Sequence, residues 1–235
     1  MFTESTVLLT GVGGEGQVGE VVAGAFAAAG ASVILVDRTT SRVNARTQAI
    51  RDAGHQASGY ACDLSDPSAV EALAETVRTS HGPSLKALVH MAGGFALSGP
   101  VAESTHEVWN RQLSINLTTA YLTARAFLPL LRVGRGSLVF FASQAALPGV
   151  AVAKISAYAV AKTGVVALMR AIAAEERPNG VRANALAPTS IRTASNVQSM
   201  GEAVRYVERQ QVADAVLFLC SEQASAITGT VMPLG

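Results

Sequence analysis

A glycine-rich segment near the start of the chain most constrains the fold. The apolar run Thr6–Thr10 leads directly into the segment Gly11–Gly19, and a helical pattern begins where this segment ends. Glycine lets the backbone turn tightly and approach a ligand closely, and the amino end of a helix attracts negative charge. The spacing G-x-G-x-x-G fits in two registers: Gly14, Gly16 and Gly19, or Gly11, Gly13 and Gly16. Its place between a strand and a helix predicts a loop that holds the pyrophosphate of a dinucleotide.

The second apolar run ends in an acidic residue. The run Val33–Val36 is followed by Asp37 and Arg38, about 20 residues beyond the glycine segment. A carboxylate at this place accepts hydrogen bonds from the adenosine ribose and repels a 2′-phosphate. Arg38 acts in the opposite direction, because a guanidinium can hold a phosphate. On balance the pattern favours NAD(H) over NADP(H).

Short apolar runs alternate with longer helical patterns along the whole chain. The predicted strands are Thr6–Thr10, Ser32–Val36, Gln56–Ala61, Leu85–His90, Gly136–Ala142, Gly180–Leu186 and Thr228–Met232. The predicted helices are Gly19–Ala29, Ser41–Ala53, Pro67–Ser80, Glu107–Leu131, Ser156–Arg177 and Val212–Ser221. Several runs are continuously apolar, as in strands that are covered on both faces. We therefore expect one α/β domain over residues 1–235, a doubly wound Rossmann domain with a seven-stranded, mainly parallel sheet and helices on both faces.

Charge and composition exclude several classes of function. The formal net charge is +1 and no basic block stands out, so nucleic acid is not an expected partner. The chain starts without an export signal, and Glu20 and Gly30 interrupt the one long apolar stretch, Val18–Val36. We therefore expect a cytoplasmic protein that does not cross a membrane. The four histidines and the two cysteines, Cys62 and Cys220, show no metal-ligand spacing, so no metal site is expected.

The scarcity of charge bears on assembly. Hydrophobic residues make up 49% of the chain and charged residues only 15%. A lone globule of this size needs more polar surface, so part of its apolar surface should be buried against another copy. The apolar residues of the Ser156–Arg177 helix spread round most of its circumference. We expect a homodimer or homotetramer with this helix and the Glu107–Leu131 helix at the interface.

A tyrosine and a lysine stand four residues apart on a predicted helix. Tyr158 and Lys162 therefore share one helical face, about one turn apart. Reduction of a carbonyl needs a proton donor at the oxygen, and the reverse reaction needs a base. A tyrosine with an ordinary pKa of about 10 needs a shift of roughly three units to act near neutrality, and a neighbouring ammonium favours its phenolate. Ser143, just after the Gly136–Ala142 strand, is placed to orient the same substrate oxygen.

Over essentially its whole length the chain resembles the short-chain dehydrogenases/reductases. The resemblance rests on eight motifs in family order: Thr10-Gly11 with the glycine loop, Cys62-Asp63-Leu64, Met91-Ala92-Gly93-Gly94, Ile115-Asn116-Leu117, Ala142-Ser143, Tyr158-x-x-x-Lys162, Pro188-Thr189-Ser190-Ile191-Arg192-Thr193 and Ile227-Thr228-Gly229. A single Y-x-x-x-K match has almost no value. The ordered set is what makes the resemblance specific.

The resemblance implies a role for each matched residue. The implied catalytic residues are Tyr158 as acid/base, Lys162 on the nicotinamide ribose, Ser143 on the substrate oxygen, and Asn116 in a proton relay through water. The implied cofactor-binding residues are Gly11, Gly14, Gly16, Gln17, Val18, Gly19, Asp37, Arg38, Asp63, Leu64, Ala92, Gly93, Pro188, Ile191 and Thr193. Among these, Asp63 would hold the adenine amino group, and Ile191 and Thr193 the carboxamide.

The chain departs from the family pattern at two places. Its glycine loop is longer than usual, with Gln17 in the slot of the middle glycine, as in divergent enoyl-acyl-carrier-protein reductases. Those enzymes, however, space the tyrosine and lysine farther apart. His90 stands in the usual asparagine-rich segment after the fourth strand, so one stabilising group on the adenosine side is missing. A fainter similarity, which includes Trp109, connects the chain with dihydropteridine reductases.

We expect an NAD(P)(H)-dependent oxidoreductase that interconverts a small-molecule carbonyl and an alcohol. Reduction of a quinonoid pterin or of an enoyl C=C bond stays open as an alternative, as does a non-catalytic dinucleotide-binding protein. The segment Ala194–Gln211 is short and polar, which predicts a small lid of one or two helical turns that is mobile without ligand. We expect this lid to favour compact polar substrates over long acyl chains, through Asn196, Gln198 and Arg192.

Overall fold

A computed structural model describes residues 2–235 as one α/β domain built on a single sheet. The sheet contains seven strands in the order β3-β2-β1-β4-β5-β6-β7, and every neighbouring pair is parallel. The strands are β1 (Thr6–Thr10), β2 (Ser32–Asp37), β3 (Ala57–Ala61), β4 (Ala87–His90), β5 (Ser137–Phe141), β6 (Arg182–Pro188) and β7 (Val231–Leu234). The order reverses between β1 and β4, and such a reversal opens a crevice at the carboxyl ends of the strands.

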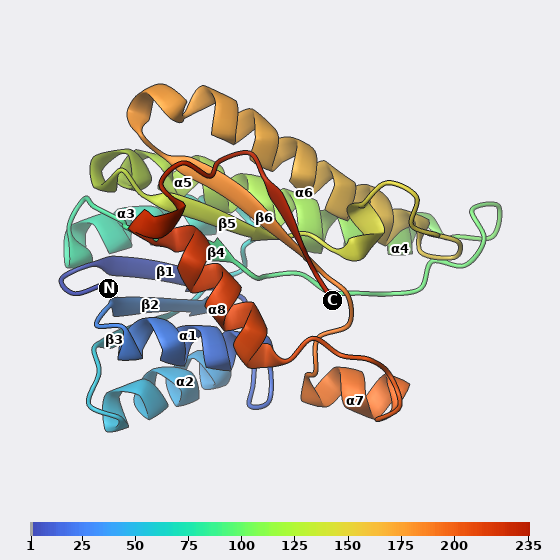
Figure 1. Ribbon diagram of the computed structural model, residues 1–235, viewed down its shortest axis with the longest axis horizontal. Helices are drawn as coiled ribbons and strands as arrows, with labels where there is room; N and C mark the ends of the chain where they lie inside the picture. The colour runs from blue at the N-terminus through green and yellow to red at the C-terminus, as the bar shows by residue number, and fades with distance from the viewer. Residues whose placement is uncertain (1) are drawn as a thin grey trace.

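Helices cover both faces of this sheet (Figure 1). They are α1 (Val18–Ala28), α2 (Thr40–Asp52), α3 (Pro67–His81), α4 (His106–Leu113), α5 (Thr119–Gly134), α6 (Ser156–Glu175), α7 (Ala194–Met200) and α8 (Arg209–Cys220). One core cluster joins the sheet to α3, α5 and α6, and the other joins it to α1, α2 and α8. The alternation of strand side chains explains this division, because Leu8 belongs to the first cluster whereas Val7 and Leu9 belong to the second.

The predicted element types are confirmed, and the largest difference concerns the Glu107–Leu131 helix. In the structure α4 ends at Leu113, a single π-helical turn spans Ser114–Thr118, and α5 follows. A π-turn inserts one extra residue into the helical ladder and often marks a functional site. Periodicity cannot show it, since the apolar stripe continues on both sides. The last two strands end two residues later than predicted, at Pro188 and Leu234.

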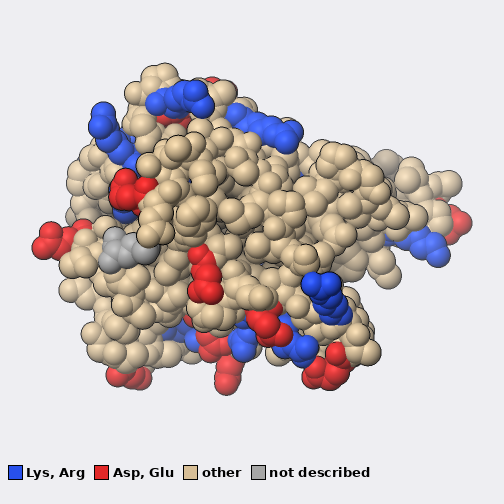
Figure 2. Space-filling view, in the orientation of Figure 1, with Lys and Arg blue, Asp and Glu red and all other residues tan. Residues whose placement is uncertain are grey.

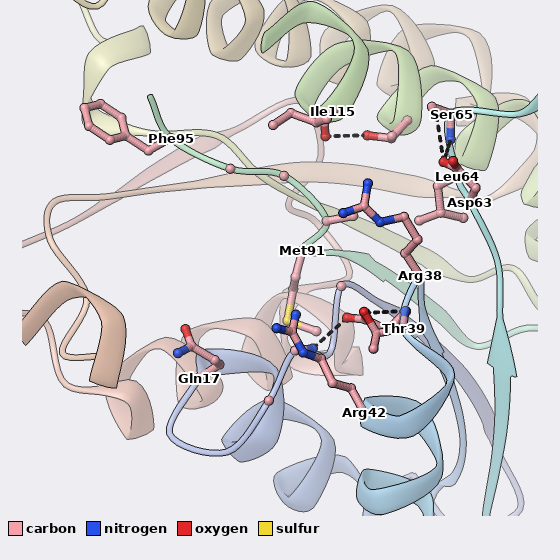
Figure 3. Close-up of a pocket in the computed structure, with 18 of the residues that line it drawn as sticks. Gln17, Arg38, Thr39, Arg42, Asp63, Leu64, Ser65, Met91, Phe95 and Ile115 are labelled. Carbon is pink, nitrogen blue, oxygen red and sulfur yellow. Dashed lines mark hydrogen bonds between the residues drawn. The ribbon is translucent and has the colours of Figure 1, made fainter. Parts of the chain in front are cut away.

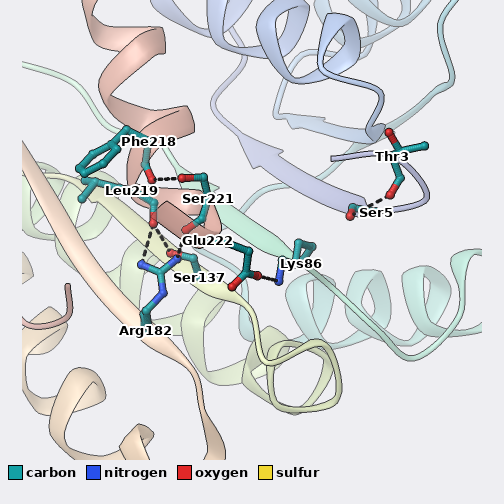
Figure 4. A network of polar contacts seen from close by, with 9 residues as sticks. All are labelled: Thr3, Ser5, Lys86, Ser137, Arg182, Phe218, Leu219, Ser221 and Glu222. Carbon is teal, nitrogen blue, oxygen red and sulfur yellow. Dashed lines mark hydrogen bonds and ion pairs between the residues drawn. The ribbon is translucent and has the colours of Figure 1, made fainter. Parts of the chain in front are cut away.

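Polar groups form a network at the amino ends of β5 and β6, opposite the crevice (Figure 4). The Arg182 guanidinium donates to the carbonyls of Leu219, at 2.7 Å, and of Ser221, at 3.1 Å. The Ser137 hydroxyl donates to the same Leu219 carbonyl at 3.0 Å. These bonds satisfy carbonyls that the end of α8 leaves without helical partners. Arg182 therefore ties β6 to α8.

The helix α6 is long and apolar enough to span a membrane by length and composition, and half of its most apolar window is buried inside the domain. Its buried residues include Ala161, Val165, Met169 and Ile172, which belong to the hydrophobic core. We interpret α6 as a core helix of this domain.

Figure 2 shows Lys and Arg interspersed with Asp and Glu on the face of the molecule that is in view, without a large patch of one sign.

Candidate active site

The crevice at the β1/β4 reversal contains a cavity of about 820 Å³ (Figure 3). This volume lies within the range of small-molecule and cofactor sites. Many of the predicted cofactor residues line it: Gly11, Gly14, Gln17, Val18, Asp37, Arg38, Asp63, Leu64, Ala92 and Gly93. Other lining residues were missed by the sequence analysis, among them Arg42, Ser65, Phe95, Arg111 and Ser195. Arg42 and Arg111 stand on ordinary polar helix faces, so no sequence signal distinguished them.

The glycine segment forms the wall of the cavity on the β1 side, and two of its glycines permit backbone contacts that a side chain would block. A Cβ on Gly19 would lie 2.3 Å from the Val12 carbonyl oxygen, so only glycine lets α1 start this close to the loop. A Cβ on Gly11, whose φ is +68°, would lie 2.5 Å from the Ala92 backbone. The cradle therefore fits a pyrophosphate that is held by backbone N–H groups. Gly16 and Gly19 support the loop without lining the cavity.

Glu20 fixes the shape of this long loop, a role that the sequence analysis missed. Its carboxylate accepts the Gly16 N–H at 2.8 Å and forms ion pairs with Arg46, at 2.9 Å, and with Arg209, at 3.1 Å. Burial by itself raises the pKa of Glu20, but the Gly16 N–H and the two arginines outweigh it and hold this pKa below its usual value. The carboxylate therefore stays ionised and joins α1, α2 and α8 beneath the loop.

Asp37 lies at the end of β2, as predicted, and is held by two main-chain donors. The Gly13 N–H donates to its Oδ2 at 2.9 Å, and the Thr39 N–H donates to its Oδ1 at 3.0 Å. Each carboxylate oxygen keeps a lone pair for a further donor, such as a ribose hydroxyl. Arg38 and Arg42 line the cavity beside it (Figure 3). The edge of the cavity thus presents one fixed carboxylate and two exposed guanidinium groups.

Asp63 and Leu64 line the cavity beyond β3, next to Arg38. Ser65 donates to Asp63 Oδ1 through its hydroxyl at 2.6 Å and through its N–H at 2.9 Å. These bonds lower the pKa of Asp63, and the charge of Arg38 adds to the effect. An ionised carboxylate fixed in this way is suited to accept a hydrogen bond from an amino group.

Tyr158 and Lys162 lie beyond the Gly93–Phe95 end of the cavity. The Lys162 Nζ is buried, 5.8 Å from the centroid of the Tyr158 ring, and donates to the Phe141 carbonyl at 2.7 Å. Burial lowers the pKa of Lys162 to about 8. Burial raises the pKa of Tyr158, and a side-chain hydrogen bond with Ser143 acts in the opposite direction. The structure thus brings together all three residues that the sequence analysis grouped.

Asn116 lies in the π-turn and clamps the chain that follows β4. Its Oδ1 accepts the Gly94 N–H at 3.1 Å, and its Nδ2 donates to the Gly94 carbonyl at 2.9 Å. A Cβ on Gly93 would lie 2.5 Å from Asn116 Oδ1 and 3.3 Å from Lys162 Nζ, so both groups adjoin Gly93. The π-turn thus brings Asn116 to the same glycine that Lys162 adjoins. The role of Asn116 in a proton relay through water stays a prediction.

His90 replaces the missing asparagine with a buried bridge between elements. The Thr119 hydroxyl donates to the Ile115 carbonyl at 2.9 Å, so it accepts from His90 Nε2 at 3.3 Å. His90 Nδ1 therefore accepts the Thr10 hydroxyl, at 3.0 Å, and the ring is neutral. Burial, with a smaller contribution from the Lys162 charge, lowers the pKa of His90 to about 3. His90 thus links β1 and β4 to the start of α5.

The segment after β6 forms the lid, and its predicted cofactor residues do not line the cavity. Pro188 ends β6, Ile191 bridges to Val207, and the Thr193 hydroxyl caps α7 by accepting the Asn196 N–H at 3.2 Å. The lid touches the glycine loop, because the Ala194 N–H donates to the Gly16 carbonyl at 3.1 Å. Its single helix, α7, has about two turns, as expected.

Two of the side chains expected to meet substrate have partners inside the lid. Arg192 forms ion pairs with Glu202, at 2.5 Å, and with Glu208, at 2.8 Å. The Asn196 Nδ2 donates to the Ile191 carbonyl at 2.8 Å. The short lid thus uses both side chains to hold its own fold, and their contact with a substrate stays a prediction. Within residues 2–235 no three His, Cys, Asp or Glu side chains are placed to hold a metal ion.

Comparison with known proteins gives a family match over nearly the whole chain. The model of the family described as enoyl-(acyl carrier protein) reductase matches residues 11–234. D-threitol dehydrogenase of Mycolicibacterium smegmatis is 31% identical over 92% of this chain and 86% of the relative. Human dehydrogenase/reductase SDR family member 4 is 31% identical over 93% of this chain and 82% of the relative.

Solved structures agree with this match. A putative short-chain dehydrogenase/reductase from Burkholderia xenovorans superposes with a TM-score of 0.89 at 30% identity, covering 99% of this chain and 95% of that one. Levodione reductase superposes with a TM-score of 0.88 at 30% identity, covering 99% and 96%. The chain therefore belongs to the short-chain dehydrogenase/reductase family, and it is an oxidoreductase that uses a nicotinamide dinucleotide.

Proposed function

We propose that this protein interconverts a carbonyl and an alcohol on a small molecule, with Tyr158 as the acid/base. One observation carries the proposal: Tyr158, Lys162, Ser143 and Asn116 gather at the Gly93–Phe95 end of a dinucleotide-sized cavity. The residues of the cavity would hold a nicotinamide dinucleotide, which would supply or accept the hydride at this end. The side chains of the protein then have to hold the substrate oxygen and move its proton.

The electrostatics around Tyr158 suit both halves of this proton transfer. Burial raises the pKa of Tyr158, so the phenol keeps its proton at neutral pH and can donate it to a carbonyl oxygen that becomes an alkoxide. In the reverse direction the phenolate has to form, and the Lys162 ammonium 5.8 Å from the ring stabilises it. Ser143, which interacts with the Tyr158 hydroxyl, is placed to donate to the same substrate oxygen.

The preferred cofactor in this proposal is NAD(H). The fixed carboxylate of Asp37 accepts ribose hydroxyls and repels a 2′-phosphate, and it outweighs the exposed guanidinium groups of Arg38 and Arg42. Asp63 and Leu64 would hold the adenine, and the glycine loop the pyrophosphate. Pro188, Ile191 and Thr193 would hold the carboxamide once the lid settles on the bound cofactor.

Three alternatives compete with this proposal. Reduction of an enoyl C=C bond agrees with the description of the matching family model, although the four-residue spacing of Tyr158 and Lys162 favours carbonyl chemistry. Reduction of a quinonoid pterin would use the same cavity. A non-catalytic binding protein would have no need of a tyrosine and a lysine in this arrangement, and it would bind NADH tightly without turning over any carbonyl.

The proposal includes a homodimer or homotetramer in the cytoplasm. Val160 on α6 is 47% exposed and Tyr121 on α5 is 49% exposed. Ala167, Ala171 and Ala174 on α6 are exposed as well, so small apolar side chains make up much of the outer side of this helix, beside the polar Thr163 and Arg170. A second copy packed against α5 and α6 would remove this surface from water.

The substitution Tyr158→Phe tests the catalytic role. It removes one hydroxyl from a group outside the cofactor cradle, so the Kd of NADH by isothermal titration should change less than threefold or so while turnover falls by about two orders of magnitude or more. Carbonyl, enoyl and quinonoid pterin substrates are assayed side by side with NADH. Retention of more than about a tenth of the wild-type rate would remove the tyrosine from the mechanism.

A further inference from the structure

The aromatic side chain of Phe95 stands in water directly against Tyr158. Their ring centroids are 5.1 Å apart, with the planes at 82°. Phe95 is 61% exposed and is the most exposed of the seven phenylalanines, four of which are almost completely buried. Figure 3 shows it at the end of the cavity opposite Asp63 and Ser65. We propose that Phe95 is a platform for the substrate, and that the substrate is an uncharged carbonyl or alcohol carried on a ring; this inference rests on the proposed function.

The backbone that carries Phe95 is held firmly on both sides. Asn116 clamps the preceding residue, Gly94, by two hydrogen bonds of 2.9 and 3.1 Å. Further along the loop, the Ser98 N–H donates to the Lys154 carbonyl at 2.8 Å. This second contact ties the loop to the segment that leads into α6 and Tyr158. An aromatic ring that is exposed yet held in place loses little conformational freedom when a ligand covers it, which is the property of a preorganised contact.

The two loops at this end of the cavity carry no ionisable side chain near Tyr158. Residues 91–102 and 144–153 contain no Asp, Glu, Lys, Arg or His. Apart from Gln144, their exposed large side chains are apolar: Phe95, Leu97, Val101 and Val152. On the lid, Arg192 is paired with Glu202 and Glu208. The two loops themselves therefore offer a charged substrate no ionic partner, and the charged group that lines this cavity from α4 is Arg111. We expect the apolar surface of the loops to favour a neutral substrate.

The edge-to-face geometry indicates a ring rather than an open chain. The Phe95 and Tyr158 rings meet at 82°, and Phe95 is still 61% exposed, so much of its ring surface is open to a ligand. A flat or cyclic skeleton can cover this surface as one rigid unit while its oxygen reaches the Tyr158 hydroxyl. An open chain of the same size covers less of the ring and has to be ordered first.

The test compares a cyclic, an open-chain and a charged cyclic ketone on four proteins. Cyclohexanone, 2-hexanone and a cyclohexanone that bears a carboxylate opposite its carbonyl are assayed with NADH. The proteins are the wild type, Phe95→Ala, Phe95→Leu, and Phe218→Ala, which truncates a half-exposed phenylalanine on α8 away from the site. Wild type should prefer cyclohexanone over both other ketones by about tenfold in kcat/KM. Phe95→Ala should lower kcat/KM for cyclohexanone by about fivefold, mainly through KM, and for 2-hexanone by less than twofold or so.

Each outcome bears on the inference. Phe95→Leu keeps apolar bulk without a flat face, so it should fall between wild type and Phe95→Ala, and Phe218→Ala should match wild type. Equal losses on the cyclic and open-chain ketones, or a wild-type preference for the charged ring, would overturn the platform while leaving the carbonyl reaction intact. An NADH Kd that rises as much as KM in Phe95→Ala would assign the side chain to the cofactor and likewise overturn it. If wild type binds NADH but converts no ketone and no alcohol, the proposed function itself fails.

Discussion

The buried ammonium of Lys162 should make the stability of this protein depend on pH in a specific way. Burial lowers the pKa of Lys162 from 10.5 to about 8. The unfolded chain therefore keeps the proton up to about pH 10.5, whereas the folded chain releases it near pH 8. Between these values the unfolded state binds more protons, so the free energy of unfolding rises with pH. At neutral pH the buried ammonium lowers the free energy of unfolding by nearly the full amount, on the order of 3 kcal/mol.

Replacement of the lysine removes this dependence. Lys162→Met leaves the Phe141 carbonyl without its 2.7 Å donor, which costs about 1–3 kcal/mol, so the variant should be as stable as wild type at pH 7 or more stable by up to about 2 kcal/mol. From pH 7 to pH 9.5 wild type should gain about 2 kcal/mol relative to the variant. Lys162→Met also removes the cation beside Tyr158, so turnover should fall although the free energy of unfolding at pH 7 does not.

Urea unfolding at fixed protein concentration measures this difference, with the pH stepped between 7 and 9.5. Other groups titrate in both proteins and cancel in the comparison. Lys154→Met is the matched control, because Lys154 is exposed to solvent and its replacement should leave a difference that does not vary with pH. Parallel stability curves for wild type and Lys162→Met would refute the argument, since they would mean that the buried ammonium carries no desolvation burden.

Three further changes test other parts of the structure. Gly19→Ala places a Cβ 2.3 Å from the Val12 carbonyl oxygen, so the loop should shift and NADH binding by fluorescence titration should weaken at least tenfold or so; unchanged affinity would show that the loop adapts. Asp37→Ser should move the ratio of kcat/KM values toward NADPH by about tenfold or more, and a wild type that prefers NADPH would show that Arg38 and Arg42 dominate. Light scattering at micromolar concentration should report a dimer or tetramer, and a mass near 24.2 kDa would exclude the assembly.

Local spacing in the sequence determined most of the fold and the pairing of Tyr158 with Lys162. Alternating apolar runs encode strands covered on both faces, and a four-residue separation places Tyr158 and Lys162 on one helical side wherever the helix packs. The position of the glycine segment between a strand and a helix likewise encodes a phosphate loop, because its geometry depends on neighbours in sequence.

Contacts between distant elements were decided only by the tertiary structure. Glu20 meets Arg46 and Arg209 because α1, α2 and α8 share one face of the sheet, and no periodicity encodes that meeting. The edge-to-face approach of Phe95 to Tyr158 likewise depends on the loop after β4 meeting the start of α6. Sequence patterns report which side of an element is buried, whereas the partner of a polar or exposed side chain is set by packing angles and loop paths that the whole chain determines together.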